Sequence, residues 1–178
     1  FKEFKNWWFY KYFNLKSKIL DRVLFFGRKD CKYSNLLRNF LSKKAKKLIY
    51  IESKTRKTKI NLRKYQNLSY DFIFCFRSFY ILKKNLISKC KYAAINFHPG
   101  TPNYRGIGSL NFAIFNNSKY YGSTAHLINS KVDSGKIIDV VRFNINKKNN
   151  LDKILEKTHK LMYLQAIKII KLLLKNKV

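Results

Sequence analysis

Two polar side chains stand together at the end of an apolar stretch near the middle of the chain. Residues 92–97 are mostly apolar, and His98-Pro99-Gly100 follow at once. Because side chains alternate along an extended strand, Asn96 and His98 point to the same side. Pro99 cannot continue a central sheet ladder and Gly100 tolerates positive φ, so the strand ends here. An amide and an imidazole are thus presented together at the carboxyl end of a strand, the edge where open parallel sheets bind ligands.

The elements that must position this pair alternate between short apolar runs and helical patterns. Such alternation predicts an α/β domain with a mostly parallel central sheet and helices on its faces. The predicted strands span residues 22–26, 48–51, 72–76, 92–97, 122–128 and 136–143. Helices are predicted around Leu36 to Leu41, in part of residues 78–87, from Ser109 onward and in a long carboxyl-terminal segment from Leu151.

Three details of the helices are expectations about single segments. Residues 53–69 are polar and basic, and we expect one irregular helix there. Ser109 is a residue type that commonly caps helices, so we expect it to be the N-cap of its helix. His159 falls within the terminal helix, and we expect it to lie on the surface.

Length and composition predict one folded domain preceded by an extension. The chain has 178 residues and begins at Phe1 rather than Met, which leaves open a fragment or a processed form. Residues 1–20 are rich in aromatic side chains and lysine, and we expect an appended helix or a partner contact there. Residues 21–178 would form the folded domain, with room for a sizeable core.

The formal charge of +30 favours anionic ligands but has two interpretations. Lysine clusters at residues 43–47 and 54–59 could hold phosphates, as in a nucleic-acid-binding module. The simpler interpretation, which we favour, is a biased composition with solvated lysines. Three widely spaced cysteines predict no disulfide framework or metal site and favour a reducing cytoplasm. No run is long enough to span a membrane.

Two common nucleotide-binding motifs are missing from the loops after the strands. Gly27 follows the first strand without the further glycines of a dinucleotide-binding fingerprint. The phosphate-binding P-loop pattern is also absent, so we expect neither cofactor class.

Four short motifs occur in a fixed order on and after the central strand. Asp133 follows Asn96 by 37 positions. In order and spacing the motifs resemble the folate-dependent formyltransferase family, which includes glycinamide ribonucleotide transformylase, methionyl-tRNA formyltransferase and the nucleotide-sugar N-formyltransferases. The resemblance covers residues 92–143 and extends back to residue 22. The motifs are Asn96-Phe97-His98-Pro99, Asn103-Tyr104-Arg105-Gly106, Gly122-Ser123-Thr124-Ala125-His126 and Val132-Asp133-Ser134-Gly135.

This resemblance implies a three-layer, Rossmann-like formyltransferase fold and a definite chemistry. The expected reaction moves a formyl group from 10-formyltetrahydrofolate to an amine, without a metal. Asn96, His98 and Asp133 occupy the places of the family's catalytic residues. Asn96 and His98 would donate hydrogen bonds to the oxyanion, a role worth about 100- to 1000-fold in rate per donor. Asp133 would orient His98 and help to take up the proton of the amine.

Two loops are implied to hold the folate, and two further side chains to hold the acceptor. His126 matches a family position near the site, although an ordinary buried histidine is an equal alternative. Arg105 would meet phosphates of the acceptor. The folate-binding residues would be Phe79, Tyr80, Ile81 and Leu82 after the third strand and Ser130, Lys131 and Val132 beside Asp133.

The acceptor is a small, phosphate-bearing amine in our interpretation, most simply a nucleotide-linked amino sugar. Glycinamide ribonucleotide is less favoured because the loop 27–32 lacks the family's glycine-rich pattern. Methionyl-tRNA is less favoured because that enzyme usually has a second, carboxyl-terminal domain. Two alternatives of other classes stay open: a basic nucleic-acid-binding module and an inactive fragment with the formyltransferase fold.

Overall fold

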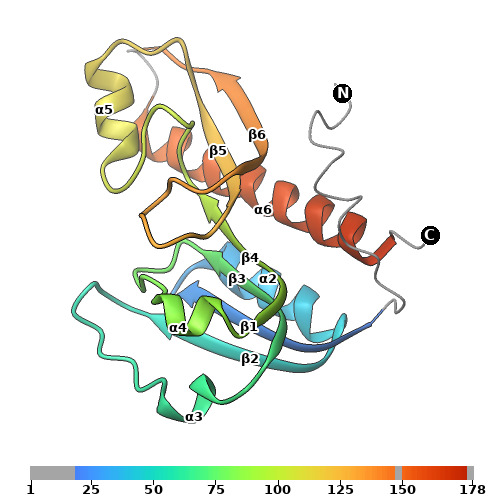
Figure 1. Ribbon diagram of the computed structural model, residues 1–178. Helices are drawn as coiled ribbons and strands as arrows, with labels where there is room; N and C mark the ends of the chain where they lie inside the picture. Colours follow the sequence, from blue (N-terminus) through green and yellow to red (C-terminus); the bar gives the residue numbers. More distant parts are fainter. Residues whose placement is uncertain (1–18, 147–149, 176–178) are drawn as a thin grey trace.

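A six-stranded sheet forms the centre of the molecule (Figure 1). The computed structural model describes residues 19–146 and 150–175, so residues 1–18 of the predicted extension at 1–20 lie outside the described residues. Leu20 already belongs to the first strand. Four neighbouring strands are parallel, and the last two are added antiparallel to their neighbours. In spatial order the strands are β2 (Ala45–Ser53), β1 (Leu20–Arg28), β3 (Tyr70–Phe76), β4 (Cys90–His98), β5 (Tyr120–Leu127) and β6 (Ile137–Asn144).

Helices cover both faces of this sheet and complete the predicted three-layer α/β architecture. One face is covered by α2 (Lys32–Ser42) and the long α6 (Leu151–Lys175), the other by the short α3 (Arg63–Gln66) and α4 (Lys84–Ile87). A further short helix, α5 (Ser109–Phe115), packs with β5 and the start of α6 beyond the parallel part of the sheet.

The strands alternate between two apolar cores, as a sheet buried on both faces requires. On β1, Val23 and Phe25 face the core under α2 and α6, whereas Leu24 and Phe26 face the core on the α3 and α4 side. The same alternation on β4 places Ala94 in the second core. Asn96 and His98 follow Ala94 at steps of two, so they continue this second face.

Two local expectations are wrong. Only Arg63–Gln66 is helical within residues 53–69, because the stretch before it folds into a turn in which the Thr58 hydroxyl accepts the N–H groups of Lys54 and Thr55. Ser109 is the first helical residue rather than the N-cap, which is Gly108 with a φ of 74°. The hydroxyl of Ser109 instead donates to the carbonyl of Pro99.

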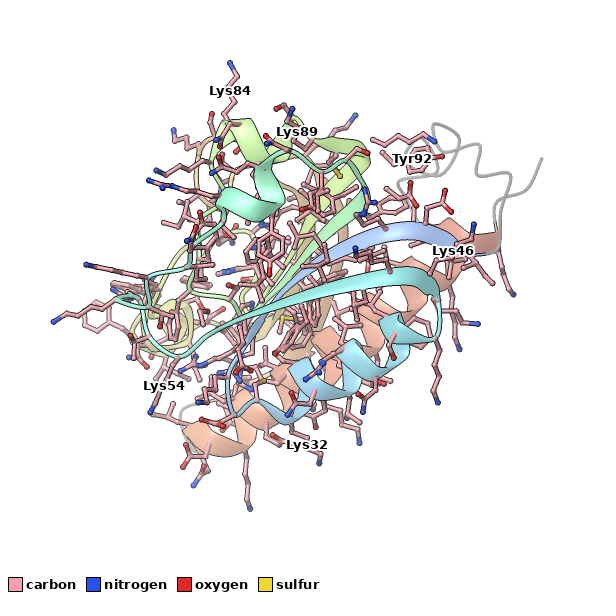
Figure 2. All side chains as sticks on the ribbon, turned by 90° about the horizontal axis from the view of Figure 1, so that it is seen from below. Lys32, Lys46, Lys54, Lys84, Lys89 and Tyr92 are labelled. Atoms are coloured by element: carbon pink, nitrogen blue, oxygen red, sulfur yellow. The ribbon has the colours of Figure 1, made fainter. Side chains whose placement is uncertain are left out.

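Basic side chains surround the molecule rather than forming one patch. Figure 2 shows nitrogen-tipped side chains pointing outward on all visible sides, with Lys32, Lys46 and Lys54 far apart around the outline. Within residues 19–146 and 150–175, no helix combines the length and hydrophobicity that crossing a membrane requires. The described cysteines, at positions 31, 75 and 90, are free thiols.

Candidate active site

The register between β4 and β5 places three polar side chains next to one another. Asn96 of β4 lies opposite His126 of β5, and His98 lies opposite Thr124. Directly opposite residues of an antiparallel pair are close neighbours on one face. The antiparallel addition of β5 therefore brings His126 beside the amide that β4 presents.

Asp133 reaches the same place from the loop between β5 and β6. Its φ is 47°, a left-handed conformation that few residues other than glycine adopt. The Asn129 side-chain oxygen accepts the Ser134 hydroxyl at 3.0 Å, which closes the loop. A Cβ atom on Gly135 would lie 1.7 Å from the Leu127 carbonyl oxygen, so the loop runs directly against β5. This tight return directs the carboxylate of Asp133 toward β4.

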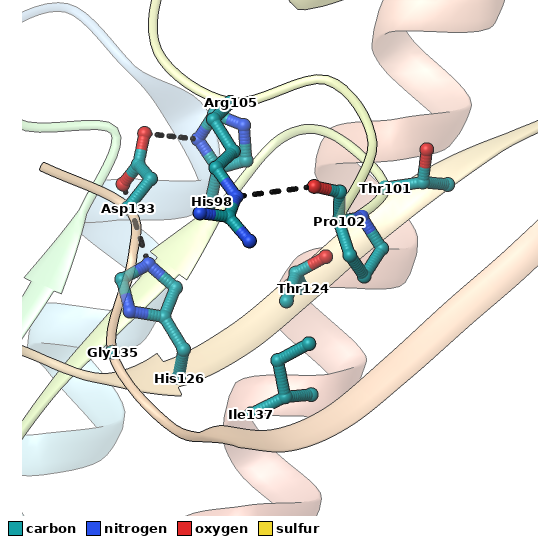
Figure 3. A pocket seen from close by; sticks show the side chains of 9 residues that line it. All are labelled: His98, Thr101, Pro102, Arg105, Thr124, His126, Asp133, Gly135 and Ile137. Atoms are coloured by element: carbon teal, nitrogen blue, oxygen red, sulfur yellow. Dashed lines mark hydrogen bonds and ion pairs between the residues drawn. The ribbon is translucent and has the colours of Figure 1, made fainter.

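The carboxylate of Asp133 contacts four groups. Oδ1 accepts an N–H of Asn96 at 2.9 Å and lies 3.3 Å from Nε2 of His126. Oδ2 accepts the backbone N–H of Gly106 at 2.9 Å and lies 3.2 Å from Nδ1 of His98. Figure 3 shows the two imidazoles on opposite sides of the carboxylate. Asn96, His98, His126 and Asp133, all singled out from the sequence, therefore lie together.

His98 has an acceptor at each ring nitrogen. Nε2 lies 2.8 Å from the Tyr104 carbonyl oxygen, and Nδ1 faces the Asp133 carboxylate. A carbonyl and an ionised carboxylate can only accept, so the geometry suits an imidazolium that donates from both nitrogens. A Cβ atom on Gly100 would lie 2.6 Å from Nε2 of His98, which explains why the turn after the strand has a glycine.

Nε2 of His126 lies between the amide of Asn96 and the carboxylate of Asp133. Nδ1 of His126 lies 2.8 Å from the Leu127 carbonyl oxygen, so this nitrogen carries a proton. Nε2 lies 3.1 Å from the Asn96 amide nitrogen and 3.3 Å from Oδ1 of Asp133: without a proton it accepts the second N–H of Asn96, and with a proton it donates to Asp133. In the first case both N–H groups of Asn96 have acceptors within the protein, and donating to a substrate oxygen requires Asn96 to exchange one of them.

The surroundings of Asp133 keep it ionised. Burial by itself raises the pKa of Asp133, but the hydrogen bond with His126, the nearby His98 and the Gly106 amide together lower that pKa to about 2. Its side chain is only 10 % exposed, so solvent screens these contacts weakly. The carboxylate therefore binds protons poorly at neutral pH.

A cleft of about 630 Å³ opens beside this cluster. Ser130, predicted with the folate-binding residues, does not line the cleft; Asn129 and Ile128 do. Two apolar side chains of the cleft lining, Ile81 and Val132, are largely exposed, at 65 % and 52 %. The lining includes Asn96, His98, His126 and Asp133 together with the predicted folate-binding residues Phe79, Tyr80, Ile81, Leu82, Lys131 and Val132.

The loop after β3 is fixed by two serine hydroxyls, one buried and one half-buried. The Ser53 hydroxyl, at the end of β2, accepts the Phe79 N–H at 2.9 Å, and the Ser78 hydroxyl accepts the Tyr80 N–H at 3.0 Å. The Tyr80 ring stacks on Phe26 at 5.2 Å between centroids. This wall of the cleft is therefore held by the ends of three strands.

The cleft also has a basic part, which contains His159. Arg28 and Arg77 both line it and have no carboxylate partner among the described residues. Burial and the neighbouring Arg77 lower the pKa of Arg28. His159, expected on the surface, is only 7 % exposed, and burial with the charge of Arg77 lowers its pKa to about 4.

The sequence contains a signal for these missed residues. His159 follows Leu155 by four positions and precedes Met162 by three, so it lies on the inward stripe of α6. Arg28 ends β1 and Arg77 directly follows β3, and parallel strands end at one edge of a sheet.

Arg105 lies apart from the large cleft. It is exposed, and its Nε donates to the Pro102 carbonyl at 3.3 Å. With His98, His126 and Asp133 it lines a separate cavity of about 50 Å³, which Figure 3 shows. Its predicted contact with acceptor phosphates stays a prediction.

Known proteins resemble this chain over parts of their length. A methionyl-tRNA formyltransferase of Clostridium novyi is 34 % identical over 99 residues, which are 55 % of this chain and 32 % of that protein. The bifunctional polymyxin resistance protein ArnA of Wigglesworthia glossinidia brevipalpis is 31 % identical over 110 residues, 61 % of this chain and 17 % of that protein. The matched region thus spans a third or less of each of these relatives.

Solved structures share the fold at low sequence identity. A sugar N-formyltransferase from Shewanella covers 89 % of this chain and 73 % of its own, with a TM-score of 0.70 and 20 % identity. A phosphoribosylglycinamide formyltransferase from Bacillus halodurans covers 88 % of this chain and 96 % of its own, with a TM-score of 0.72 and 17 % identity. These likenesses confirm the predicted fold class.

The sequence model of the formyl transferase family matches residues 21–169. This match includes the six strands, the loop of Asp133 and most of α6. The chain belongs to the formyl transferase family.

Proposed function

We propose that this chain transfers a formyl group from 10-formyltetrahydrofolate to the amine of a phosphate-bearing acceptor, a nucleotide-linked amino sugar. The observation that carries the proposal is the contact of Asn96, His98 and His126 with one buried carboxylate, Asp133, in the wall of a large cleft. The free thiols fit the reducing cytoplasm that we expect as its compartment.

The cleft has suitable dimensions and lining for a folate. Sites for small organic ligands typically enclose about 300–1,000 Å³ and are mostly apolar with a few placed polar groups. The volume here, about 630 Å³, falls in that range. The stretch 79–82 forms one wall and residues 131–132 line the cleft next to Asp133, so a pterin between them would bring its formyl carbon near Asn96.

Asn96 and His98 would stabilise the charge that develops when an amine attacks a formyl carbon. 10-Formyltetrahydrofolate supplies the formyl group, whose oxygen becomes negative during the attack. The bond from the formyl carbon to N10 then breaks, and N10 takes up a proton as tetrahydrofolate leaves. Asn96 can direct an N–H to this oxygen by releasing its contact with Nε2 of His126. His98, held between the Tyr104 carbonyl and the Asp133 carboxylate, would stabilise the same negative charge in a largely buried site.

Asp133 would orient the two donors and take part in moving the proton of the amine. Its pKa of about 2 makes it a weak proton acceptor at neutral pH. It holds Nδ1 of His98 and one N–H of Asn96, and so fixes the direction of both donors. It would also help to take up the proton of the amine and pass it on, because it holds a proton only weakly.

The basic part of the cleft supports a phosphate-bearing acceptor. Arg28, Arg77 and Arg56 line it, and Arg28 is held over the Phe79 ring at 4.4 Å. Planar guanidinium groups bind phosphate oxygens through two parallel hydrogen bonds. His159, neutral at physiological pH, could donate to a phosphate or hydroxyl without adding charge.

Turnover with 10-formyltetrahydrofolate tests the proposal directly. Purified protein would be incubated with a nucleotide-linked amino sugar, glycinamide ribonucleotide or methionyl-tRNA, and formylated product measured by mass spectrometry. We expect product with the amino sugar, and a fall in kcat of about 100- to 1000-fold in Asn96→Ala, because one donor to the oxyanion is lost.

The matched control is Asn39→Ala, which removes the same side chain from the exposed face of α2. It should keep the wild-type rate. Equal rates in Asn96→Ala and wild type would refute the assigned site. Absence of turnover with every amine, together with salt-sensitive binding to RNA or DNA, would favour the alternative of a basic nucleic-acid-binding module.

A further inference from the structure

Three buried hydroxyl groups meet the two carbonyl groups that follow His98. The Tyr121 hydroxyl donates to the Pro99 carbonyl at 2.5 Å, and the Ser109 hydroxyl lies 2.9 Å from the same oxygen. The Thr124 hydroxyl donates to the Gly100 carbonyl at 2.7 Å. We call these three side chains the hydroxyl clamp. They come from β5 and the first turn of α5, and their exposed fractions are 0 %, 7 % and 4 % for Tyr121, Ser109 and Thr124.

The clamp has fewer protons than contacts, so its members depend on one another. The hydroxyls of Tyr121 and Ser109 also lie 2.7 Å apart. Each hydroxyl carries one proton, so two protons serve three contacts around the Pro99 oxygen. The shortest contact, from Tyr121, takes one proton, and Ser109 shares the other between Pro99 and Tyr121. Removing the Tyr121 hydroxyl therefore disturbs both remaining partners.

The turn that the clamp holds is the start of a loop that supplies the active site with backbone groups. β4 ends at His98, and the chain returns so that the Tyr104 carbonyl meets Nε2 of His98 and the Gly106 N–H meets Asp133. A Cβ atom on Gly100 would lie 2.7 Å from the Tyr104 oxygen, so the turn and the returning loop are in direct contact. A small shift at Pro99 or Gly100 would be transmitted to both ends of the His98–Asp133 pair.

We infer that Tyr121 and Thr124 are positioning residues for His98. They would fix the imidazole by holding the two peptide groups after it. Tyr121 also lines the large cleft, whereas Thr124 does not, so Thr124 separates positioning from substrate contact. The expected effect on the reaction rate rests on the proposed function. The expected effect on the position of the His98 ring does not. The simpler alternative is that the hydroxyls merely satisfy buried carbonyls, which would affect stability alone.

The test uses the imidazole itself as the reporter. The chain has three histidines, so ¹H–¹⁵N spectra of the full protein resolve few imidazole signals, and a His98→Gln variant identifies those of His98. We expect Tyr121→Phe and Thr124→Val to move the Nδ1 and Nε2 signals of His98, because the hydroxyl is lost while the shape is nearly kept. Thr124→Ser, which retains the hydroxyl, should restore them.

Kinetics give the second measurement. A displacement of about 1 Å in a catalytic group can cost about 100-fold in rate. We expect Tyr121→Phe to lower kcat by about 10- to 100-fold with an unchanged KM for 10-formyltetrahydrofolate. Tyr120→Phe is the matched control, because Tyr120 is 52 % exposed and lies outside the cleft lining.

The two proposals fail in different ways. Unchanged His98 signals in both Tyr121→Phe and Thr124→Val, with only a lower Tm, would overturn the positioning role. If Tyr121→Phe does not fold, Thr124→Val against Thr124→Ser decides the same question. Absence of turnover in the wild type would defeat the proposed function, while the imidazole signals would still test the clamp.

Discussion

Asp133 shows how much of this site depends on one residue. Its two oxygens contact Asn96, His98, Gly106 and His126, which lie on two strands and one loop. A buried carboxylate is costly unless such partners compensate it. Removing the carboxylate would leave several donors without an acceptor, so the cluster behaves as a unit and effects of single substitutions will not add.

His159 leads to a prediction about stability in mild acid. Its pKa is about 4 in the folded protein, against about 6.5 in an unfolded chain. Between these values the unfolded state binds a proton that the folded state does not, so the free energy of unfolding falls as pH drops from about 6.5 to about 4. At about 1.4 kcal/mol per pKa unit, the loss is at most about 3 kcal/mol.

Urea titrations of wild type and His159→Gln between pH 7 and pH 4 measure this effect. The difference between the two proteins should shrink as pH falls, because glutamine does not titrate. Asp133 has a depressed pKa, so its contribution is present above about pH 4 and is lost only as pH falls toward 2. Parallel pH profiles for wild type and His159→Gln would contradict the buried, neutral histidine.

For single residues, the sequence predicts side-chain direction wherever the alternation along a strand determines it. The shared direction of Asn96 and His98 follows from their spacing of two along β4. The position of Asp133 does not follow from its spacing in the sequence. Its left-handed backbone and the loop closure by Asn129 appear only in the folded structure. Asp133 was identified only through the family resemblance. The sequence does carry a signal for His159, because Leu155 and Met162 flank it at helical spacing on the inward stripe of α6.

At the scale of elements, the sheet order decides which residues meet. All six strands were predicted within a few residues of their observed bounds, yet the direction of β5 was not. Apolar patterning is the same for parallel and antiparallel strands, so only the fold shows that His126 lies beside Asn96. The expected helix over 53–69 failed because a polar stretch without periodicity carries little helical information.

Two glycines in different loops give a paired prediction: Gly135 lies between β5 and β6, and Gly106 lies between β4 and α5. Gly135→Ala would place a methyl group against the Leu127 carbonyl, so backbone must move, and we expect a loss of about 2–3 kcal/mol in the free energy of unfolding. Gly106→Ala has open space at its Cβ position and a φ of 72°, so it should lose only about 1 kcal/mol from backbone strain. Urea unfolding of both variants compares them; equal losses would contradict the close approach at Gly135.

The whole molecule carries a large excess of positive charge. Lys and Arg number 39 against nine Asp and Glu, and Figure 2 shows the basic side chains spread over the visible surface. Such a distribution repels itself and favours expansion of the chain. It also raises the local concentration of anions around the cleft, where Arg28, Arg56 and Arg77 are exposed to a ligand.

Stability should therefore rise with salt. Increasing the ionic strength from about 0.01 M to about 0.1 M shortens the screening length from about 30 Å to about 10 Å and weakens the repulsion. We expect Tm in sodium chloride to increase by about 2–4 °C for each kcal/mol regained. The variant Lys57→Glu/Lys59→Glu, changed at two exposed positions, should show a smaller rise. A Tm that falls with salt would mean that ion pairs outweigh repulsion.

Several partners of the cluster around Asp133 are peptide groups: the carbonyls of Tyr104 and Leu127 and the N–H of Gly106. Main-chain atoms are the same whichever side chain is attached to them. Mutation can thus replace many of the surrounding side chains while the contacts persist. Distant homologues of this chain would then share only a few invariant residues in sequences that otherwise differ.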